Sequence, residues 1–363
     1  MDTAKKFRPE TILLWQKAAD QPEAQRIINM FPSANIKIVE QQRLPVSNMS
    51  PSQALIAGKR ILMIGHTSSF IGYFNGMLGE NIHCRPYYKL VPVSNGCPYF
   101  CTYCYLAYVY RKFSPFIKIN INYDTMYKQI RKALANSNSN ISFNMGEMLD
   151  SLALDHITNL TTELIPFFGG LSKGYLMLLT KSGNIDNLLK LEPNHKVVIS
   201  WSLNPKQITR QYEKGTASLD ERIGAAQKCQ SKGYRIRIRI DPGIYYPNWQ
   251  TGYAELIEKT LSAIEPENIT LGMLRLLPGH FNLAKNAYGT NTTNLLYNHF
   301  VKGASDSKLR YPIETRINFY NFLIDTIRSF NKKVSISLCR ETHDIWNIFK
   351  SHCEPQKCNC VTW

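Results

Sequence analysis

The 363-residue sequence lacks the features of a membrane or secreted protein. No stretch approaches the roughly 18 uninterrupted apolar residues of a membrane-spanning helix. The segment from Met1 to Phe7 has no apolar core of the kind that a signal peptide needs. We therefore expect a cytoplasmic protein with no membrane partner. In that compartment, its nine cysteines indicate metal or redox chemistry rather than disulfides.

Acidic side chains are also scarce. The sequence has 27 Asp and Glu residues against 43 Lys and Arg residues, which gives a formal net charge of +16. A positive field of this size attracts polyanions and speeds their capture, so we expect a nucleic acid as partner, with DNA as the first choice. A basic surface that serves only solubility is the alternative that composition leaves open.

A second cysteine pair is missing near the loop Cys97-Pro98-Tyr99-Phe100-Cys101-Thr102-Tyr103-Cys104. A zinc knuckle usually draws four ligands from two short pairs. Three thiols spaced C-x3-C-x2-C favour instead a four-iron, four-sulfur cluster with one iron open to an outside ligand. The amine and carboxylate of S-adenosylmethionine could chelate that iron. One electron passed to its sulfonium would then release methionine and a 5′-deoxyadenosyl radical. An electron donor such as flavodoxin or ferredoxin is implied.

Short apolar runs alternate with longer helical patterns from Lys89 onward. Six runs are expected as strands: 89–93, 141–145, 175–180, 196–202, 234–240 and 269–277. The longer patterns are expected as helices: 102–111, 123–135, 151–168, 185–191, 218–232, 252–264 and 313–330. This order predicts an α/β fold with a parallel sheet, a partial (β/α)6 barrel with reactive groups at the C-terminal ends of its strands.

The chain is expected to have three parts. Residues 1–86 form an N-terminal α/β extension, residues 87–338 form the barrel, and residues 339–363 form a cysteine-rich tail. Within the extension, residues 11–19 have the spacing of a helix, whereas residues 35–40 and 60–64 are typical of short strands.

Several short segments carry a family resemblance, and they occur in one order along the chain. They are the loop 95–106 and the segments 154–157, 179–181, 202–204, 215–223, 232–234 and 249–253. Together they resemble the radical S-adenosylmethionine superfamily and, more closely, its spore photoproduct lyase family of DNA-repair enzymes. The resemblance implies a radical carbon–carbon lyase that abstracts hydrogen from a nucleic-acid base, either to repair a thymine dimer or to modify the base.

The resemblance also implies roles for individual residues. Cys97, Cys101 and Cys104 would hold the cluster. Lys181, Ser202 and Asn204 would contact S-adenosylmethionine. Tyr103 and Tyr105 would lie beside the path of the radical, where a phenol can pass a hydrogen atom, although packing against a buried cluster is the alternative for both.

One position departs from the family. A cysteine near the end of the second strand donates hydrogen to the repaired thymine in spore photoproduct lyase, and Glu147 stands at the matching position here. A carboxylate has no weak S–H bond to give. Gly146-Glu147 resembles instead the glycine–glutamate that binds the methionine amine in many radical S-adenosylmethionine enzymes, so we expect Glu147 to bind the cofactor.

The run Arg235-Ile236-Arg237-Ile238-Arg239-Ile240-Asp241 alternates with the period of a strand. If the isoleucines pack under the outer helices, Arg237 and Arg239 point into the barrel. There they could clamp a carboxylate or phosphate, and we place Arg239 among the residues that bind the cofactor. A strand with one solvated face is the alternative.

The C-terminal region contains Cys339, Cys353, Cys358 and Cys360. These cysteines could hold zinc or a second iron–sulfur cluster. They could also be reduced thiols, one of which replaces the missing hydrogen donor, or they could be incidental. Nearby, Arg310 and Tyr311 resemble a basic-aromatic segment that approaches the DNA lesion in the repair enzymes, with a solvated basic turn as the alternative.

Two other functions fit parts of this pattern. A radical S-adenosylmethionine enzyme with an auxiliary C-terminal cluster could act on a peptide or a small molecule. A zinc-stabilised protein could bind nucleic acid without catalysis.

Overall fold

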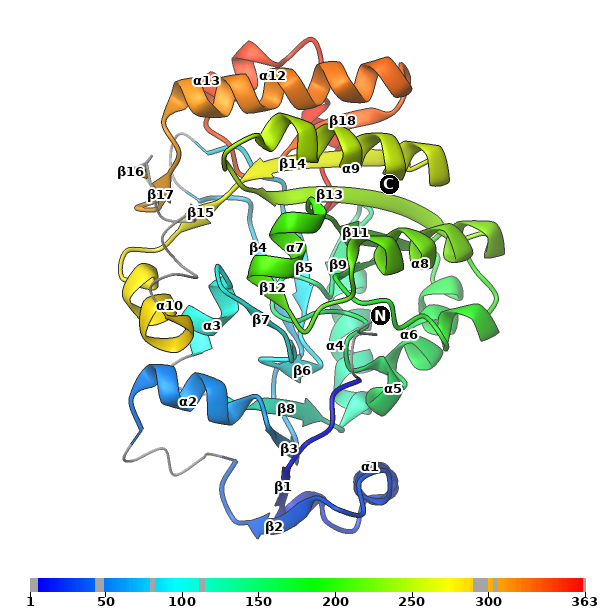
Figure 1. Cartoon of the computed structure of the whole chain (residues 1–363). Helices are drawn as coiled ribbons and strands as arrows, with labels where there is room; N and C mark the ends of the chain where they lie inside the picture. Colours follow the sequence, from blue (N-terminus) through cyan, green and yellow to red (C-terminus); the bar gives the residue numbers. More distant parts are fainter. Residues whose placement is uncertain are drawn as a thin grey trace.

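The computed structural model describes residues 6–42, 49–78, 82–110, 115–289, 300–302 and 306–361. The fold is mixed α/β, as the sequence predicts. Figure 1 shows the N-terminal strands at the bottom of the view and helices α9 (Trp249–Ala263) and α12 (Ile313–Phe330) stacked at the top. Among the described residues, no helix has both the length and the apolar character that crossing a membrane requires.

The larger sheet has eight strands in the order β18-β14-β13-β11-β10-β9-β5-β4. Their bounds are β4 (Ile71–Phe74), β5 (Tyr87–Leu90), β9 (Ser142–Asn144), β10 (Tyr175–Thr180), β11 (Val197–Ser202), β13 (Arg235–Gly243), β14 (Asn268–Met273) and β18 (Ser335–Leu338). All neighbouring strands pair in parallel except β4 and β5, which are antiparallel. All six predicted strands are present, and β18 is a seventh parallel strand that the prediction missed.

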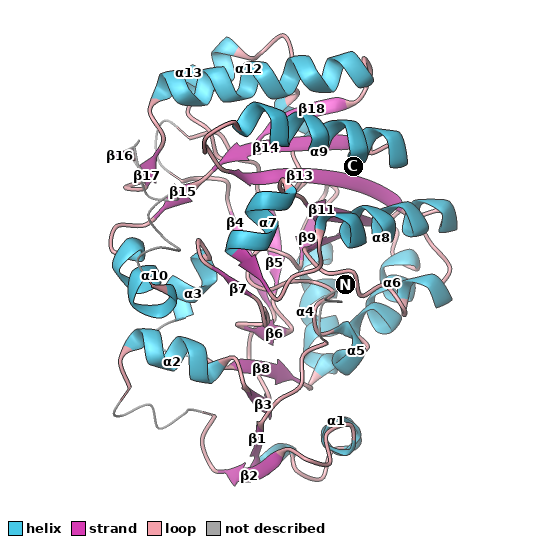
Figure 2. Ribbon diagram, in the orientation of Figure 1, coloured by secondary structure: helices cyan, strands magenta, loops and turns pink. Residues whose placement is uncertain are grey.

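This sheet is an open, partial barrel. Within the described part of the chain, its edge strands β4 and β18 do not pair with each other. A single bridge between Ile82 and Thr342 nevertheless joins the segments that flank β5 and β18. Figure 2 shows β18, β14 and β13 following one another down the view, with α12 above β18. Parallel strands that run in one direction bring their C-terminal ends, and the side chains that follow them, to one edge.

Helices cover the outer face of the sheet. They are α4 (Tyr123–Ala135), α5 (Asp155–Thr158), α6 (Leu160–Gly169), α7 (Lys206–Tyr212), α8 (Leu219–Lys232), α9 and α12. The expected helix 151–168 is divided at Asn159, whose left-handed backbone (φ 50°) interrupts the helix. The expected helix 185–191 is reduced to a 3-10 turn, η2 (Leu188–Lys190).

The smaller sheet has the order β2-β1-β3-β8-β6. Its strands are β1 (Thr11–Trp15), β2 (Asn35–Val39), β3 (Ile61–Gly65), β6 (Val93–Ser94) and β8 (Ile117–Asn120), with η1 (Gln16–Ala18), α1 (Pro22–Asn29) and α2 (Pro51–Gly58) between them. Two of these strands, β6 and β8, follow residue 86, so the sheet includes segments from both sides of the expected boundary. The helix expected at 11–19 is wrong. Ile12, Leu13 and Leu14 are all buried, as in a parallel strand covered on both faces, and such a short apolar run has no clear period.

The remaining elements border the C-terminal edge of the large sheet. They are β7 (Phe100–Cys101), α3 (Tyr105–Tyr110), β12 (Glu213–Lys214), β15 (Arg275–Leu276), α10 (His280–Tyr288), β16 (Val301–Lys302), β17 (Leu309–Arg310), α13 (His343–Ile348) and η3 (Pro355–Lys357). Strands β15, β17 and β16 form a small antiparallel sheet of their own.

Candidate active site

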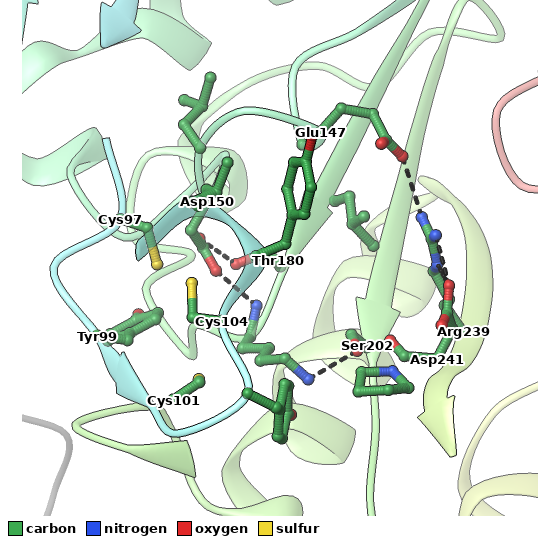
Figure 3. A pocket seen from close by; sticks show the side chains of 18 of the residues that line it. Cys97, Tyr99, Cys101, Cys104, Glu147, Asp150, Thr180, Ser202, Arg239 and Asp241 are labelled. Carbon is green, nitrogen blue, oxygen red and sulfur yellow. Dashed lines mark hydrogen bonds and ion pairs between the residues drawn. The ribbon is translucent and has the colours of Figure 1, made fainter. Parts of the chain in front are cut away.

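The cysteine loop follows β5 and is held by short elements. Strand β6 precedes it, β7 within it pairs with β12, and α3 follows Cys104. Cys97, Cys101 and Cys104 all line one pocket of about 240 Å³. Figure 3 shows these three cysteines on one side of the pocket. The remaining lining residues are Tyr99, Tyr103, Tyr105, Leu106, Gly146, Glu147, Leu149, Asp150, Leu179, Thr180, Lys181, Ser202, Arg239, Asp241, Pro242, Leu274, Arg275 and Arg340.

The three thiols are close enough to affect one another's ionisation. Burial raises the pKa of Cys97 to about 12, and the Cys104 thiol contributes to the rise. Burial also raises the pKa of Cys101, with both other thiols among the further causes. Three thiolates can share this space when a cationic group neutralises them, so this donor set fits an iron–sulfur cluster.

A buried carboxylate that the sequence prediction missed connects the expected cofactor residues. Glu213 accepts hydrogen bonds from Lys181 and Asn204, each at 2.8 Å, and from the hydroxyl of Tyr103. Arg222 pairs with its second oxygen at 2.6 Å. Burial alone would raise the pKa of Glu213, but Arg222 and Lys181 hold it well below its usual range. We call these five residues the Glu213 network.

The remaining predicted cofactor residue of this group, Ser202, joins the Glu213 network through Lys181. The Lys181 ammonium donates to Ser202 Oγ at 2.8 Å, and Arg222 donates to the Ser202 carbonyl at 2.9 Å. Arg222 lies inside the segment 215–223 that carries the family resemblance, and Glu213 lies two residues before it. That proximity is the signal that could have identified them.

The opposite side of the pocket contains a second charged group. Glu147 Oε1 lies 3.3 Å from Arg239, and its Oε2 accepts from Arg340 at 3.0 Å. Asp241 pairs with Arg239 at 2.6 Å and with Arg275 at 2.9 Å. We call these five residues the arginine network. Figure 3 shows Glu147 extending toward Arg239 and away from the cysteines.

The arginine network changes the interpretation of Glu147. Burial would raise the pKa of this carboxyl, but Arg340 and Arg239 overcome that effect and keep the pKa low. Both carboxylate oxygens face guanidinium groups, so a methionine amine would share this carboxylate with Arg239 and Arg340. Arg239 is itself paired with Glu147 and Asp241. The expected cofactor roles of Glu147 and Arg239 stay predictions.

On β13, isoleucines and arginines alternate between the two faces of the strand, and Arg237 and Arg239 have different partners. The three isoleucines are buried, at 1–2% exposure. Arg239 lines the pocket, whereas Arg237 contacts Glu267 at 3.2 Å and donates to the carbonyls of Cys358 and Val361 in the tail.

The fold buries both predicted substrate residues, Arg310 and Tyr311, outside the lining of the pocket. Arg310 is buried and forms two hydrogen bonds with Asp306, at 2.6 and 2.7 Å. Tyr311 is also buried and stacks on Phe300 at 4.5 Å between ring centroids. Neither residue lines the pocket. Their neighbour Lys308 lies instead above the pocket-lining ring of Tyr105, 5.7 Å from its centroid.

Among the described residues, the expected second metal site at the four C-terminal cysteines finds no support, and these thiols lie in different surroundings. Cys353 packs in the main hydrophobic core, whereas Cys358 and Cys360 pack beside Tyr87. Cys339 follows β18, and its sulfur accepts from Arg239 at 3.1 Å. Burial raises the pKa of Cys339 and Cys353 to about 12 each. Cys339 and Cys353 have different packing partners, whereas Cys358 and Cys360 pack together, and the Cys358 thiol adds to the raised pKa of Cys360.

Comparisons with known proteins agree with this geometry. A family model described as "Spore photoproduct lyase" matches residues 7–285. A curated spore photoproduct lyase from a Geobacillus species is 26% identical over 262 residues, which is 72% of this chain and 75% of the relative. The enzyme from Bacillus subtilis is 26% identical over 268 residues, with the same coverage.

Two solved structures show the same fold. A spore photoproduct lyase variant with dinucleoside spore photoproduct superposes with a TM-score of 0.80 at 21% identity, over 92% of this chain and 100% of that chain. A second variant, with bound AdoMet and dinucleoside spore photoproduct, gives a TM-score of 0.78 at 21% identity, over 92% of this chain and 99% of that chain.

Proposed function

Because the chain belongs to the spore photoproduct lyase family, we propose that it is a radical S-adenosylmethionine lyase that abstracts hydrogen from a nucleic-acid base. The observation that carries the proposal is the pocket itself. It joins the three cysteines to Lys181 and Ser202, which are connected through the Glu213 network.

The residues of the pocket have distinct parts in this proposal. Cys97, Cys101 and Cys104 would hold a four-iron, four-sulfur cluster, which with S-adenosylmethionine supplies a 5′-deoxyadenosyl radical. Lys181 and Ser202 present an ammonium and a hydroxyl to the carboxylate and ribose of the cofactor, and Glu213 fixes the position of Lys181. The apolar side chains of Leu149, Leu179 and Leu274 exclude water from the radical.

The rim of the pocket supports a nucleic-acid substrate. Burial, together with Arg340 and Arg275, lowers the pKa of Lys308 to about 8. The carboxylate closest to Lys308, that of Asp306, is 3.9 Å away and already binds Arg310. Three cations lie here, Lys308, Arg340 and Arg275, and the nearby carboxylates do not fully neutralise their charge, which suits a phosphodiester. Tyr105, which is 45% exposed, offers a surface on which a base can stack.

The hydrogen donor of the family is absent at Glu147, so another group would return hydrogen to a repaired base. Two thiols contact side chains that line the pocket. Cys339 contacts Arg239, and Cys360 lies 3.8 Å from Glu147. Their raised pKa values keep both as thiols, which retain an S–H bond.

The proposal is tested by anaerobic reconstitution with iron and sulfide, followed by reduction in the presence of S-adenosylmethionine. We expect about four irons per chain and formation of 5′-deoxyadenosine. Oligonucleotides deuterated at candidate positions should transfer deuterium into that product. Spore photoproduct DNA provides the specific test, because recovered thymine identifies repair. Transfer from another base would identify modification, and transfer from a peptide alone would contradict the proposed substrate.

A further inference from the structure

Lys59 is a buried lysine that reaches the cysteine loop from the smaller sheet. It directly follows α2 and is 5% exposed. Its ammonium donates to the carbonyl of Cys97 at 3.0 Å and to the carbonyl of Tyr99. It also lies 5.1 Å from the centroid of the Phe100 ring. All three neighbours belong to the loop that carries the cluster cysteines.

The end of α2 is fixed in place, so this contact is rigid. Ser50 and Gln53 form a capping box at the start of the helix. At its end, Gly58 packs directly on the chain that leads into β8. A Cβ at Gly58 would lie 2.2 Å from the Pro115 carbonyl oxygen, so only glycine permits this approach.

A second buried lysine shows what is particular to Lys59. Lys196 donates to the Ser172 carbonyl at 2.9 Å and lies 4.6 Å from the Tyr175 ring centroid. A buried lysine with carbonyl and aromatic neighbours therefore also occurs away from the cysteine loop. The carbonyls around Lys59 differ because they belong to the cluster loop.

The charge of Lys59 is also not neutralised. Lys181, which also lies near the loop, pairs with Glu213 at 2.8 Å. For Lys59, the structure shows carbonyl and aromatic neighbours and no carboxylate at ion-pair distance within the described residues. Its full positive charge therefore acts at short range, in surroundings of low dielectric constant, on whatever the three thiolates bind.

We infer that Lys59 is a positioning residue for the iron–sulfur cluster. Lys59 holds the loop through two carbonyls, and its charge stabilises the reduced cluster. The inference rests on the proposed function and extends it to the N-terminal part of the chain. Reduction adds one electron from the outside donor and breaks no bond. The cluster becomes more negative, and a fixed cation nearby favours that form, which raises the reduction potential.

The test replaces Lys59 by Gln, which removes the charge and keeps a hydrogen-bond donor, by Met, which removes both, and by Arg, which keeps the charge. Lys196→Gln is the matched control, because it removes a buried lysine of similar surroundings away from the loop. Each protein is reconstituted, its iron and sulfide are counted, and its midpoint potential is measured by titration with detection by electron paramagnetic resonance.

We expect Lys59→Gln to disfavour reduction about tenfold, which for one electron corresponds to a potential about 59 mV more negative. Lys59→Arg and Lys196→Gln should stay near the unaltered protein. Cluster assembly in Lys59→Arg but in neither Gln nor Met variant also supports the inference. Equal potentials in all variants overturn it, and so does loss of the cluster in all three Lys59 variants, because the requirement would then be steric. Absence of a cluster from the unaltered protein overturns the proposed function itself.

Discussion

The two charged sides of the pocket are built differently. In the Glu213 network, one carboxylate binds two cations, a phenol and an amide, and its oxygens point to residues that carry the family resemblance. In the arginine network, two carboxylates face three guanidinium groups, and Glu147 stands where the family has a cysteine. The Glu213 network borders the cluster loop through the pairing of β7 and β12. The arginine network borders the C-terminal tail.

This difference separates cofactor chemistry from substrate chemistry. The side that contacts the cluster loop contains Lys181, Ser202 and Asn204, which are predicted to bind the cofactor. The opposite side contains Glu147, at the position where the family resemblance predicts a hydrogen donor, so we expect a change in substrate or in hydrogen return to be located there. Each network can be altered alone, which makes the separation testable.

The largest effect is expected from the cluster cysteines. Cys101→Ala should abolish cluster assembly and all cleavage of S-adenosylmethionine, because two thiolates cannot hold three irons. Cys229→Ala, a change of a buried cysteine inside α8, is the control and should leave iron content unchanged. Iron counting and product analysis measure both. Cleavage that survives in Cys101→Ala would refute the assignment of the loop.

Removal of the Glu213 carboxylate should rank second. Glu213→Ala leaves Lys181 and Arg222 without their shared partner, and we expect a loss of roughly 3–5 kcal/mol in unfolding free energy. Because the folded-state pKa of Glu213 is strongly depressed, its contribution is fully present above the ordinary Glu pKa of 4.5 and is lost progressively as the pH falls from there toward the much lower folded-state pKa. The difference in unfolding free energy between the unaltered protein and Glu213→Ala, measured by denaturant titration at pH 7 and at pH 3, tests this. An equal loss in Glu163→Ala, on the partly exposed face of α6, would remove any special role of the network.

Glu147→Gln should affect the substrate and spare the cofactor. With one neutral amide opposite Arg239 and Arg340, we expect turnover of a nucleic-acid substrate to fall roughly tenfold, or ~1.4 kcal/mol in activation free energy. Cleavage of S-adenosylmethionine without substrate should stay nearly constant. Glu213→Gln should show the reverse order, with cofactor cleavage affected first. If Glu147→Gln abolishes cofactor cleavage, the carboxylate binds the methionine amine after all.

The smallest effect is expected at Lys308. Its lowered pKa of about 8 means that the cation is present below pH 8 and is lost above it. Affinity for a single-stranded oligonucleotide should therefore weaken between pH 7 and pH 9, by the contribution of one phosphate contact. Lys308→Arg should bind independently of pH in this range, as measured by fluorescence anisotropy at fixed salt. A pH dependence that persists in Lys308→Arg would assign it to another group.

The sequence alone identified the parts of the site that are local in the chain. The roles of Lys181, Ser202 and Asn204 follow only from the family resemblance and stay predictions. The C-x3-C-x2-C loop and the alternation on β13 could be predicted from the residues themselves, because each depends on spacing within one segment. The six main strands of the barrel were predicted for the same reason. The strand at Thr11–Trp15 was not, since three consecutive buried apolar residues fit a helix or a strand equally well.

The tertiary structure decided what depends on contacts between distant segments. Glu213 lies 110 residues from Tyr103, and Glu147 lies 193 residues from Arg340, yet each pair is joined by a hydrogen bond. Only the folded chain shows where each C-terminal cysteine packs and that Lys59 reaches the cluster loop. Spacing along a sequence fixes the ligands that one loop can offer. The charges that surround those ligands come from strands and helices far along the chain, and the packing of the sheets brings them together.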